Sequence, residues 1–179
     1  MLKSNTAHLQ ADLFSSITLL PHEKQKKLRV SKKWYFYDLI FCQIDESLFE
    51  CLYSEKGSRP NAPVNTMVAS LILKHQFGWT FQELFDHIDF DLLTRAALGL
   101  RCFSTTPFAP STLFDFQRRL WEHEVLTGEN LFETVFDRLL IETINQTYSL
   151  PVLYAVKGGP VLNDATVEDA QEAGLDRVA

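Results

Sequence analysis

The amino-acid pattern changes near residue 146, and this change constrains the fold more than any other feature of the chain. Up to about Gln146 apolar residues recur at helical spacing, whereas from Tyr148 the pattern is typical of a β-strand, a glycine turn and a short helix. A single strand cannot form a stable sheet. We therefore predict a mainly α fold: a multi-helix domain with helix-turn-helix-like elements, then a short C-terminal β-turn-α tail that lacks partner strands.

Three parts follow from this pattern and from the distribution of charge. Residues 1–33 are predicted to be a basic, loosely structured N-terminal arm with a short helix near Ala11–Ser16. Residues 34–146 form the predicted helical domain, and residues 147–179 form an unrelated or truncated tail. A chain of 179 residues is long enough for one hydrophobic core and an appendage.

The clearest helical signals lie in the middle of the chain. Val64 to Phe77 has apolar residues at i, i+3, i+4 and i+7, and Gly78 is a typical residue to end such a helix. Thr80 and Glu83 have the spacing of a capping box, which predicts a second helix to about Ile88. Two helices joined by a short turn with a glycine predict a helix-turn-helix.

Other helical segments are predicted from weaker patterns. The expected bounds are Ile40–Tyr53, Asp91–Leu98, a helix capped by Ser111 or Thr112, and Glu129–Asn145. In the first of these, the side chains expected on the buried face are Ile44, Leu48, Cys51 and Leu52.

Charge is distributed unevenly, although the whole chain carries a net charge of −6. Residues 1–33 contain seven lysines and arginines against two acids, a net charge of +5, and residues 34–179 contain ten against twenty-one, a net charge of −11. A basic cluster followed by aromatic residues is suited to phosphate contact, but the same pattern fits a solvated linker before core aromatics. The candidate DNA-binding cations of this cluster are Lys24, Lys26, Lys27, Arg29, Lys32 and Lys33.

A second candidate for DNA recognition is the segment of residues 111–120. A helix that begins with serine and threonine can approach a phosphate through its free N–H groups. Gln117, Arg118 and Arg119 can reach base edges or phosphates. The alternative is an ordinary surface helix, in which Asp115 and Arg119 form an i, i+4 pair. Neither the histidines nor the cysteines have metal-ligand spacing, so no metal site is predicted from these residue types.

Residues 34–145 resemble the N-terminal domain of insertion-sequence transposases. The resemblance implies a helical domain that binds double-stranded DNA at the terminal inverted repeats of the element, either as a homo-oligomer or with a full-length transposase. It also implies that strand transfer requires a downstream RNase H-like domain with Mg²⁺, so we expect no cofactor and no strand-transfer activity in this chain. The stretches that carry the resemblance are residues 52–57, 63–74, 77–84, 91–99 and 111–120.

Residues 156–175 resemble a segment of the metal-dependent damage-control phosphatases. In that family an Asn-Asp turn lies near the active site, which would make Asn163 and Asp164 weak candidates for metal binding. The alternative for this pair is a turn and a helix cap. Asp164 also resembles the first catalytic acid of the transposases, but a single carboxylate cannot hold a two-metal site.

Taken together, the two resemblances predict a chimera, in which a DNA-binding transposase domain, truncated before its catalytic domain, is joined to a piece of a phosphatase sequence. The alternatives are a protein–protein assembly module of a transposase, or a fusion remnant with a non-functional phosphatase-like tail. No apolar run has the length of a membrane span, and the N-terminus does not resemble a signal peptide. We therefore expect a cytoplasmic, nucleoid-associated protein of a bacterium or archaeon without a membrane partner.

Overall fold

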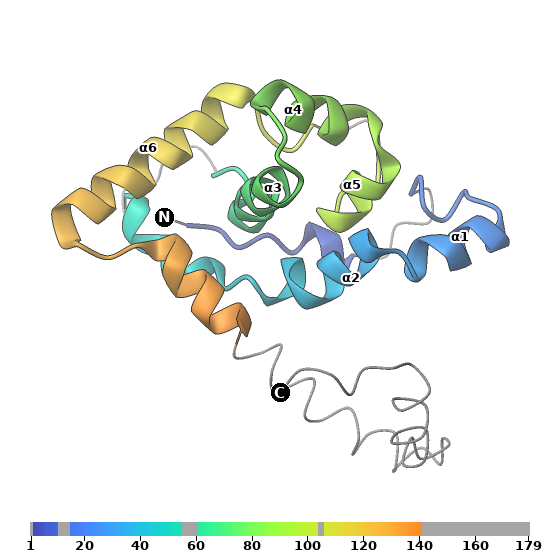
Figure 1. The fold of residues 1–179 in the computed structure, drawn as a ribbon, viewed down its shortest axis with the longest axis horizontal. Coiled ribbons are helices and arrows are strands. Elements are labelled where there is room, and N and C mark those ends of the chain that lie inside the picture. Colours follow the sequence, from blue (N-terminus) through green and yellow to red (C-terminus); the bar gives the residue numbers. More distant parts are fainter. Residues whose placement is uncertain (1, 11–14, 55–60, 104–105, 141–179) are drawn as a thin grey trace, which may run out of the picture. The chain divides into compact units, whose positions relative to one another are not determined.

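The computed structural model describes residues 2–10, 15–54, 61–103 and 106–140 (Figure 1). These residues are mainly helical and contain no β-strand, which confirms the predicted fold class. The chain divides into two compact units, Met1–Leu139 and Leu140–Ala179. The predicted β-turn-α tail, including Asn163 and Asp164, lies outside the described residues.

Helix α3 (Val64–Phe77) lies in the centre of the first unit (Figure 1). Every residue from position 64 to 73 is buried, and Ser70 satisfies its hydroxyl by donating to the Thr66 carbonyl at 2.7 Å. The helix ends at Gly78, whose φ of 68° lies in the left-handed region that favours glycine. Its bounds are those predicted from the apolar pattern. Burial of each large apolar side chain contributes about 1.5–3 kcal/mol relative to exposure.

Helices α4 (Phe81–Phe90) and α5 (Leu92–Ala97) follow α3, and both begin at side-chain caps. The Thr80 hydroxyl accepts from the Glu83 N–H, while Glu83 accepts from the Thr80 N–H, so the predicted capping box is present. Asp91 caps α5 by accepting from the Leu93 N–H at 2.9 Å. The expected turn between two helices at Gly78 and the helix after Asp91 are therefore confirmed.

Helix α6 (Pro110–Thr127) begins differently from the prediction. Ala109 precedes it without a side-chain cap, and Pro110 occupies its first turn, where a missing N–H costs nothing. The prediction that Ser111 or Thr112 caps this helix is therefore wrong. Gly128, with a φ of 74°, ends α6, and a further helix covers residues 131–140 up to the end of the described part. That helix buries Leu131, Val135 and Leu139.

The segment predicted as a loosely structured arm is folded wherever it is described. It contains η1 (Ala7–Leu9), α1 (His22–Arg29) and the start of α2 (Lys32–Leu39). His8 is 9% exposed and packs edge-on against Phe41, with ring centroids 5.1 Å apart. The prediction of a loose arm is wrong there because buried side chains anchor the segment to the core. Residues 11–14 of the helix expected near Ala11–Ser16 lie outside the described residues.

The helix predicted over Ile40–Tyr53 is replaced by two 3₁₀ segments, η2 (Phe41–Gln43) and η3 (Glu46–Leu52). Asp45 separates them, because its carboxylate accepts from the Ser47 N–H and hydroxyl and caps η3. The tighter 3₁₀ turn changes which side chains face inward. The buried residues are Phe41, Ile44, Glu46 and Phe49, whereas Cys51, which we expected on the buried face, is exposed.

Candidate nucleic-acid interface

Helix α1 carries most of the basic cluster on its exposed surface. Its anchor is Leu28, which is 4% exposed, and the capping Ser31 hydroxyl accepts from the Trp34 N–H to start α2 after a short turn. A helix with one buried apolar residue leaves the rest of its circumference to solvent. The exposed cations on α1 and at the start of α2 are Lys24, Lys26, Lys27, Arg29 and Lys32.

Few carboxylates oppose these charges. Within the described part of the chain, the ion pair recorded for the five cations joins Lys26 Nζ to Glu23 at 3.7 Å, and both side chains are largely exposed. Exposed pairs of this kind contribute about 0–1 kcal/mol and leave the cation accessible. The α1 surface therefore presents a concentrated positive charge to solvent, within a chain whose remainder is acidic.

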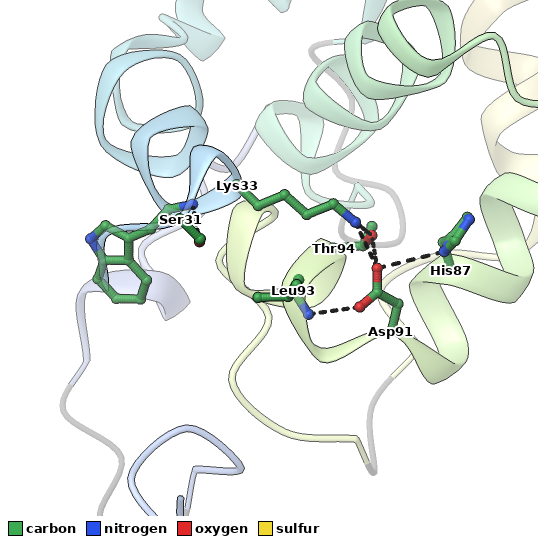
Figure 2. A network of polar contacts seen from close by, with 7 residues as sticks. Ser31, Lys33, His87, Asp91, Leu93 and Thr94 are labelled. Atoms are coloured by element: carbon green, nitrogen blue, oxygen red, sulfur yellow. Dashed lines mark hydrogen bonds and ion pairs between the residues drawn. The ribbon is translucent and has the colours of Figure 1, made fainter. Parts of the chain in front are cut away.

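Lys33 differs from its neighbour Lys32, because it points into the protein (Figure 2). Its Nζ donates to the Asp91 carboxylate at 2.7 Å and to the Thr94 hydroxyl at 2.7 Å. It also lies 5.4 Å from the centroid of the Trp79 ring. Lys33 is only 18% exposed, so the structure engages this predicted DNA-binding cation in a contact within the protein that ties α2 to α5.

Asp91 is the centre of this polar network. Partial burial disfavours its ionised form, yet hydrogen bonds from Lys33, Thr94 and the Leu93 N–H outweigh burial and hold the pKa of this carboxyl below its ordinary value. His87 Nδ1 lies 3.5 Å from the same carboxylate. The network thus links the end of α4, the start of α5 and the first turn of α2 through one charge.

The candidates on α6 do not share a face. Consecutive residues of an α-helix are about 100° apart, so Gln117, Arg118 and Arg119 point in different directions. Arg118 lies between two acids, with Nη2 at 3.3 Å from Asp115 and Nη1 at 2.8 Å from Glu122. Hydrogen bonds to Glu122 and Asp115 raise the pKa of Arg118. Its charge is therefore balanced on its own helix.

Arg119 lies at the edge of a pocket that sequence reasoning missed. Its guanidinium is 5.4 Å from the centroid of the Tyr53 ring, and the pocket has a volume of about 880 Å³. Polar groups on its wall include Asn61, Thr112 and Asp115. The pocket brings together the end of η3, the start of α3 and the first turns of α6, which no local pattern could predict.

The second helix of the helix-turn-helix pattern, α4, has an acidic exposed surface. Its exposed side chains include the acids Glu83, Asp86 and Asp89, which repel phosphate.

Among the described residues no group of three or more histidine, cysteine, aspartate or glutamate side chains could hold a metal ion. Asn163 and Asp164 lie outside this part. No described helix is long and apolar enough to cross a membrane.

Comparison with known proteins identifies the larger part of the chain. The family model of the transposase domain DUF772 matches residues 23–119. This chain belongs to the DUF772 transposase-domain family. The match begins at the second residue of α1, so the exposed basic helix lies inside the transposase domain rather than in an arm that precedes it.

The C-terminal part resembles another family. The family model of the damage-control phosphatase ARMT1-like domain matches residues 129–179. A damage-control phosphatase of Pyrococcus horikoshii is 41% identical over 66 residues, which cover 37% of this chain and 23% of that protein. An uncharacterised protein of Methanocaldococcus jannaschii is 47% identical over 51 residues, or 28% of this chain and 16% of that protein.

Both resemblances expected from the sequence are therefore confirmed, one to a transposase domain and one to a damage-control phosphatase. The chain spans less than a quarter of the length of these two curated relatives. No solved structure matches the chain. The phosphatase-like match begins at residue 129, earlier than the change of pattern near residue 146, and so includes the helix over residues 131–140.

Proposed function

We propose that this chain binds double-stranded DNA through the basic surface of α1 and the start of α2, as the DNA-binding part of an insertion-sequence transposase. The observation that carries the proposal is the group of five exposed cations, which has one weak carboxylate partner in the described part of the chain. Membership of a transposase-domain family supports the same role. Phosphate neutralisation by lysine and arginine supplies most of the affinity in such contacts.

The candidate residues differ in exposure and in their ion pairs, and these differences give them different roles in the proposal. Lys24, Lys26, Lys27, Arg29 and Lys32 are accessible and bind phosphates in this proposal. Lys33 acts by holding α2 against α5 and contributes to DNA affinity only through the fold. On α6, Gln117 and Arg119 remain candidates for additional contacts, whereas Arg118 contributes less because two carboxylates already pair with it.

The terminal inverted repeats of a mobile element are the proposed DNA target, and the experiment tests first whether duplex DNA is bound at all. Fluorescence anisotropy with a labelled duplex, measured over a range of salt concentrations, gives both the affinity and the number of phosphates neutralised. Five contacts correspond to a slope of about −4.5 in the plot of log affinity against log salt. Lys24→Gln with Lys27→Gln should reduce that slope by about 2 and weaken binding by at least tenfold.

The matched control removes two positive charges elsewhere. Lys3 and Arg138 are exposed, and Arg138 pairs with Asp45 at 2.7 Å. Lys3→Gln with Arg138→Gln changes the net charge equally but should leave the slope unchanged. Equal loss of affinity in the two double variants would contradict a localised DNA site on α1 and indicate a general effect of net charge.

A further inference from the structure

The pocket beside Arg119 is lined by buried apolar side chains and by two charged side chains of α6. Met67, Phe108 and Phe116 border the pocket and are 1%, 5% and 2% exposed, so they belong to the hydrophobic core. Asp115 and Arg119 border it from α6. Small-molecule sites have volumes of about 300–1,000 Å³ and combine apolar walls with a few polar groups. At about 880 Å³, this pocket has the size and the composition of a ligand site.

The two charged side chains lie next to each other and both can bind a ligand. Asp115 and Arg119 are four positions apart, so they lie one helical turn apart on the same stripe of α6. In the described part of the chain, the contact recorded for Arg119 is with the Tyr53 ring, and the side chain that pairs with Asp115 is Arg118, whose Nη2 lies 3.3 Å from Oδ1. The N–H donors of Arg119 and the second oxygen of Asp115 are therefore available for hydrogen bonds.

The opposite charges of this pair exclude several kinds of ligand. Inorganic phosphate would meet the carboxylate of Asp115 beside Arg119, and a metal cation would meet the guanidinium of Arg119. A purely apolar molecule would cover both groups without giving either a hydrogen-bond partner, which costs free energy. The pair and the aromatic walls favour a neutral, flat molecule that has hydrogen-bond donors next to acceptors on its edge.

We propose that this pocket binds an unpaired guanine base. The acceptors O6 and N7 of guanine match two donors of an arginine, which is the commonest specific contact between an arginine and a base. The N1–H and the N2 amino group are donors, and an ionised carboxylate such as Asp115 accepts from both. These two edges of guanine meet at O6, so Arg119 and Asp115 can bind them at the same time. The face of the base packs against the aromatic walls.

The other bases match the pair less well. Adenine has an amino group where guanine has O6, so it offers Arg119 one acceptor instead of two on that edge. Cytosine has an amino group for Asp115 but lacks the O6 and N7 pair, and uracil has no amino group. Hypoxanthine, the base of inosine, is guanine without the N2 amino group. A comparison of guanosine with inosine therefore isolates the contact with Asp115.

This inference is independent of the proposed DNA contact on α1. A nucleoside has no phosphate, so the cations of α1 add nothing to its affinity. The guanine could belong to a free nucleoside or to an unpaired position in a DNA strand. A guanine paired with cytosine has its N1–H and N2 amino group engaged and cannot offer them to Asp115. The two probes are therefore guanosine and a single-stranded oligothymidine with one central guanine.

The experiment is isothermal titration calorimetry of the full chain with each nucleoside. We expect guanosine to bind with a dissociation constant below about 1 mM, and at least about tenfold more tightly than inosine or uridine, since a hydrogen bond to a charged group is lost with either of them. Arg119→Gln should weaken guanosine binding at least about tenfold. Asp115→Asn should remove most of the preference for guanosine over inosine.

Matched controls separate the pocket from general effects of charge. Glu122 pairs with the same Arg118 as Asp115 does, but it does not line the described part of the pocket. Glu122→Gln should therefore leave the preference for guanosine unchanged. The double variant Lys24→Gln with Lys27→Gln should keep its guanosine affinity and lose duplex affinity. Far-UV circular dichroism checks that each variant is folded.

Three results would overturn the proposal: no binding of guanosine at about 1 mM, equal affinities for guanosine, inosine and uridine, or equal effects of Asp115→Asn and Glu122→Gln. The oligonucleotide distinguishes the sources. Tighter binding to it than to guanosine would assign the pocket to a DNA strand, and binding of guanosine alone would assign it to a free nucleoside. Guanosine binding without duplex binding would contradict the proposed function of α1 and leave the pocket assigned.

Discussion

Adjacent lysines provide the sharpest test of the structure, because Lys32 and Lys33 are identical in chemistry but differ in surroundings. Lys33→Met keeps most of the length of the side chain and removes its charge, leaving Asp91 without its cation. Lys32→Met makes the same chemical change at an exposed position. We expect the first variant to lose stability and to keep the proposed DNA affinity, and the second to keep its stability and to lose part of that affinity.

The expected loss of stability follows from how exposed the Lys33 and Asp91 side chains are. The side chains of Lys33 and Asp91 are 18% and 27% exposed, so the pair lies between a surface ion pair and a buried one. Surface pairs contribute about 0–1 kcal/mol, and removal of one partner of a buried pair costs about 3–5 kcal/mol. We therefore expect Lys33→Met to lower the free energy of unfolding by about 1–3 kcal/mol, and Lys32→Met to change it by less than about 0.5 kcal/mol.

The interaction energy between Lys33 and Asp91 can be isolated with a double-mutant cycle. Asp91→Asn removes the charge and keeps a residue that caps α5 nearly as well. The double variant of Lys33→Met and Asp91→Asn should lose less than the sum of the two single variants, with a coupling energy of about 1 kcal/mol. Urea denaturation supplies the free energies, and thermal melting should show a shift of roughly 3–5 °C per kcal/mol.

The dependence on pH gives a further check on the mechanism. Because the folded-state pKa of Asp91 is lowered from its ordinary value of 3.8, its stabilising contribution is present above that value and is lost as pH falls through the folded-state pKa. The difference between the wild-type chain and Lys33→Met should therefore be full near neutral pH and decrease in acid. A stability difference between wild type and Lys33→Met that stays constant down to pH values at which Asp91 is protonated would refute the role of the Lys33–Asp91 ion pair. Equal destabilisation by Lys32→Met would refute it as well.

Two further predictions concern the contact between the N-terminal segment and the core. Gly99→Ala should destabilise the protein by about 2–4 kcal/mol in urea denaturation, because φ is +68° there and a Cβ atom would lie 2.8 Å from the Phe41 ring and 2.9 Å from His8. Gly128 also has a positive φ but lies in open space, so Gly128→Ala should cost about 1 kcal/mol. Equal losses in the two variants would contradict the close approach at Gly99. Burial lowers the pKa of His8 from its ordinary value of 6.5, so folding favours the neutral ring, stability is complete above that value, and it decreases as pH falls below it toward the folded-state pKa. The stability of His8→Leu should vary less with pH in this window, and an unchanged pH profile would show that another group is responsible.

The helices that the sequence predicted well are those whose signals are local. The apolar stripe of α3, Gly78 at its end and the capping box of Thr80 and Glu83 each involve residues within one or two helical turns, so their bounds could be read along the chain. The Ile40–Tyr53 segment was predicted wrongly because its apolar residues fit helical spacing as well as two 3₁₀ turns. Which of them the chain adopts depends on what Phe41 and Phe49 pack against.

Family membership, the helical class and the positive charge near the N-terminus follow from the sequence by itself, since they depend on residue types and their order. Only the tertiary structure shows which of the cations are exposed to solvent. Lys32 and Lys33 are indistinguishable in sequence, but the packing of α2 against α5 brings Asp91 to Lys33 and leaves Lys32 in solvent. Likewise only packing shows that α6 presents Trp121 outward, because the face that a helix buries depends on elements that are distant in sequence. The acids that balance Arg118 lie three and four positions away on the same helix and are therefore visible in the sequence.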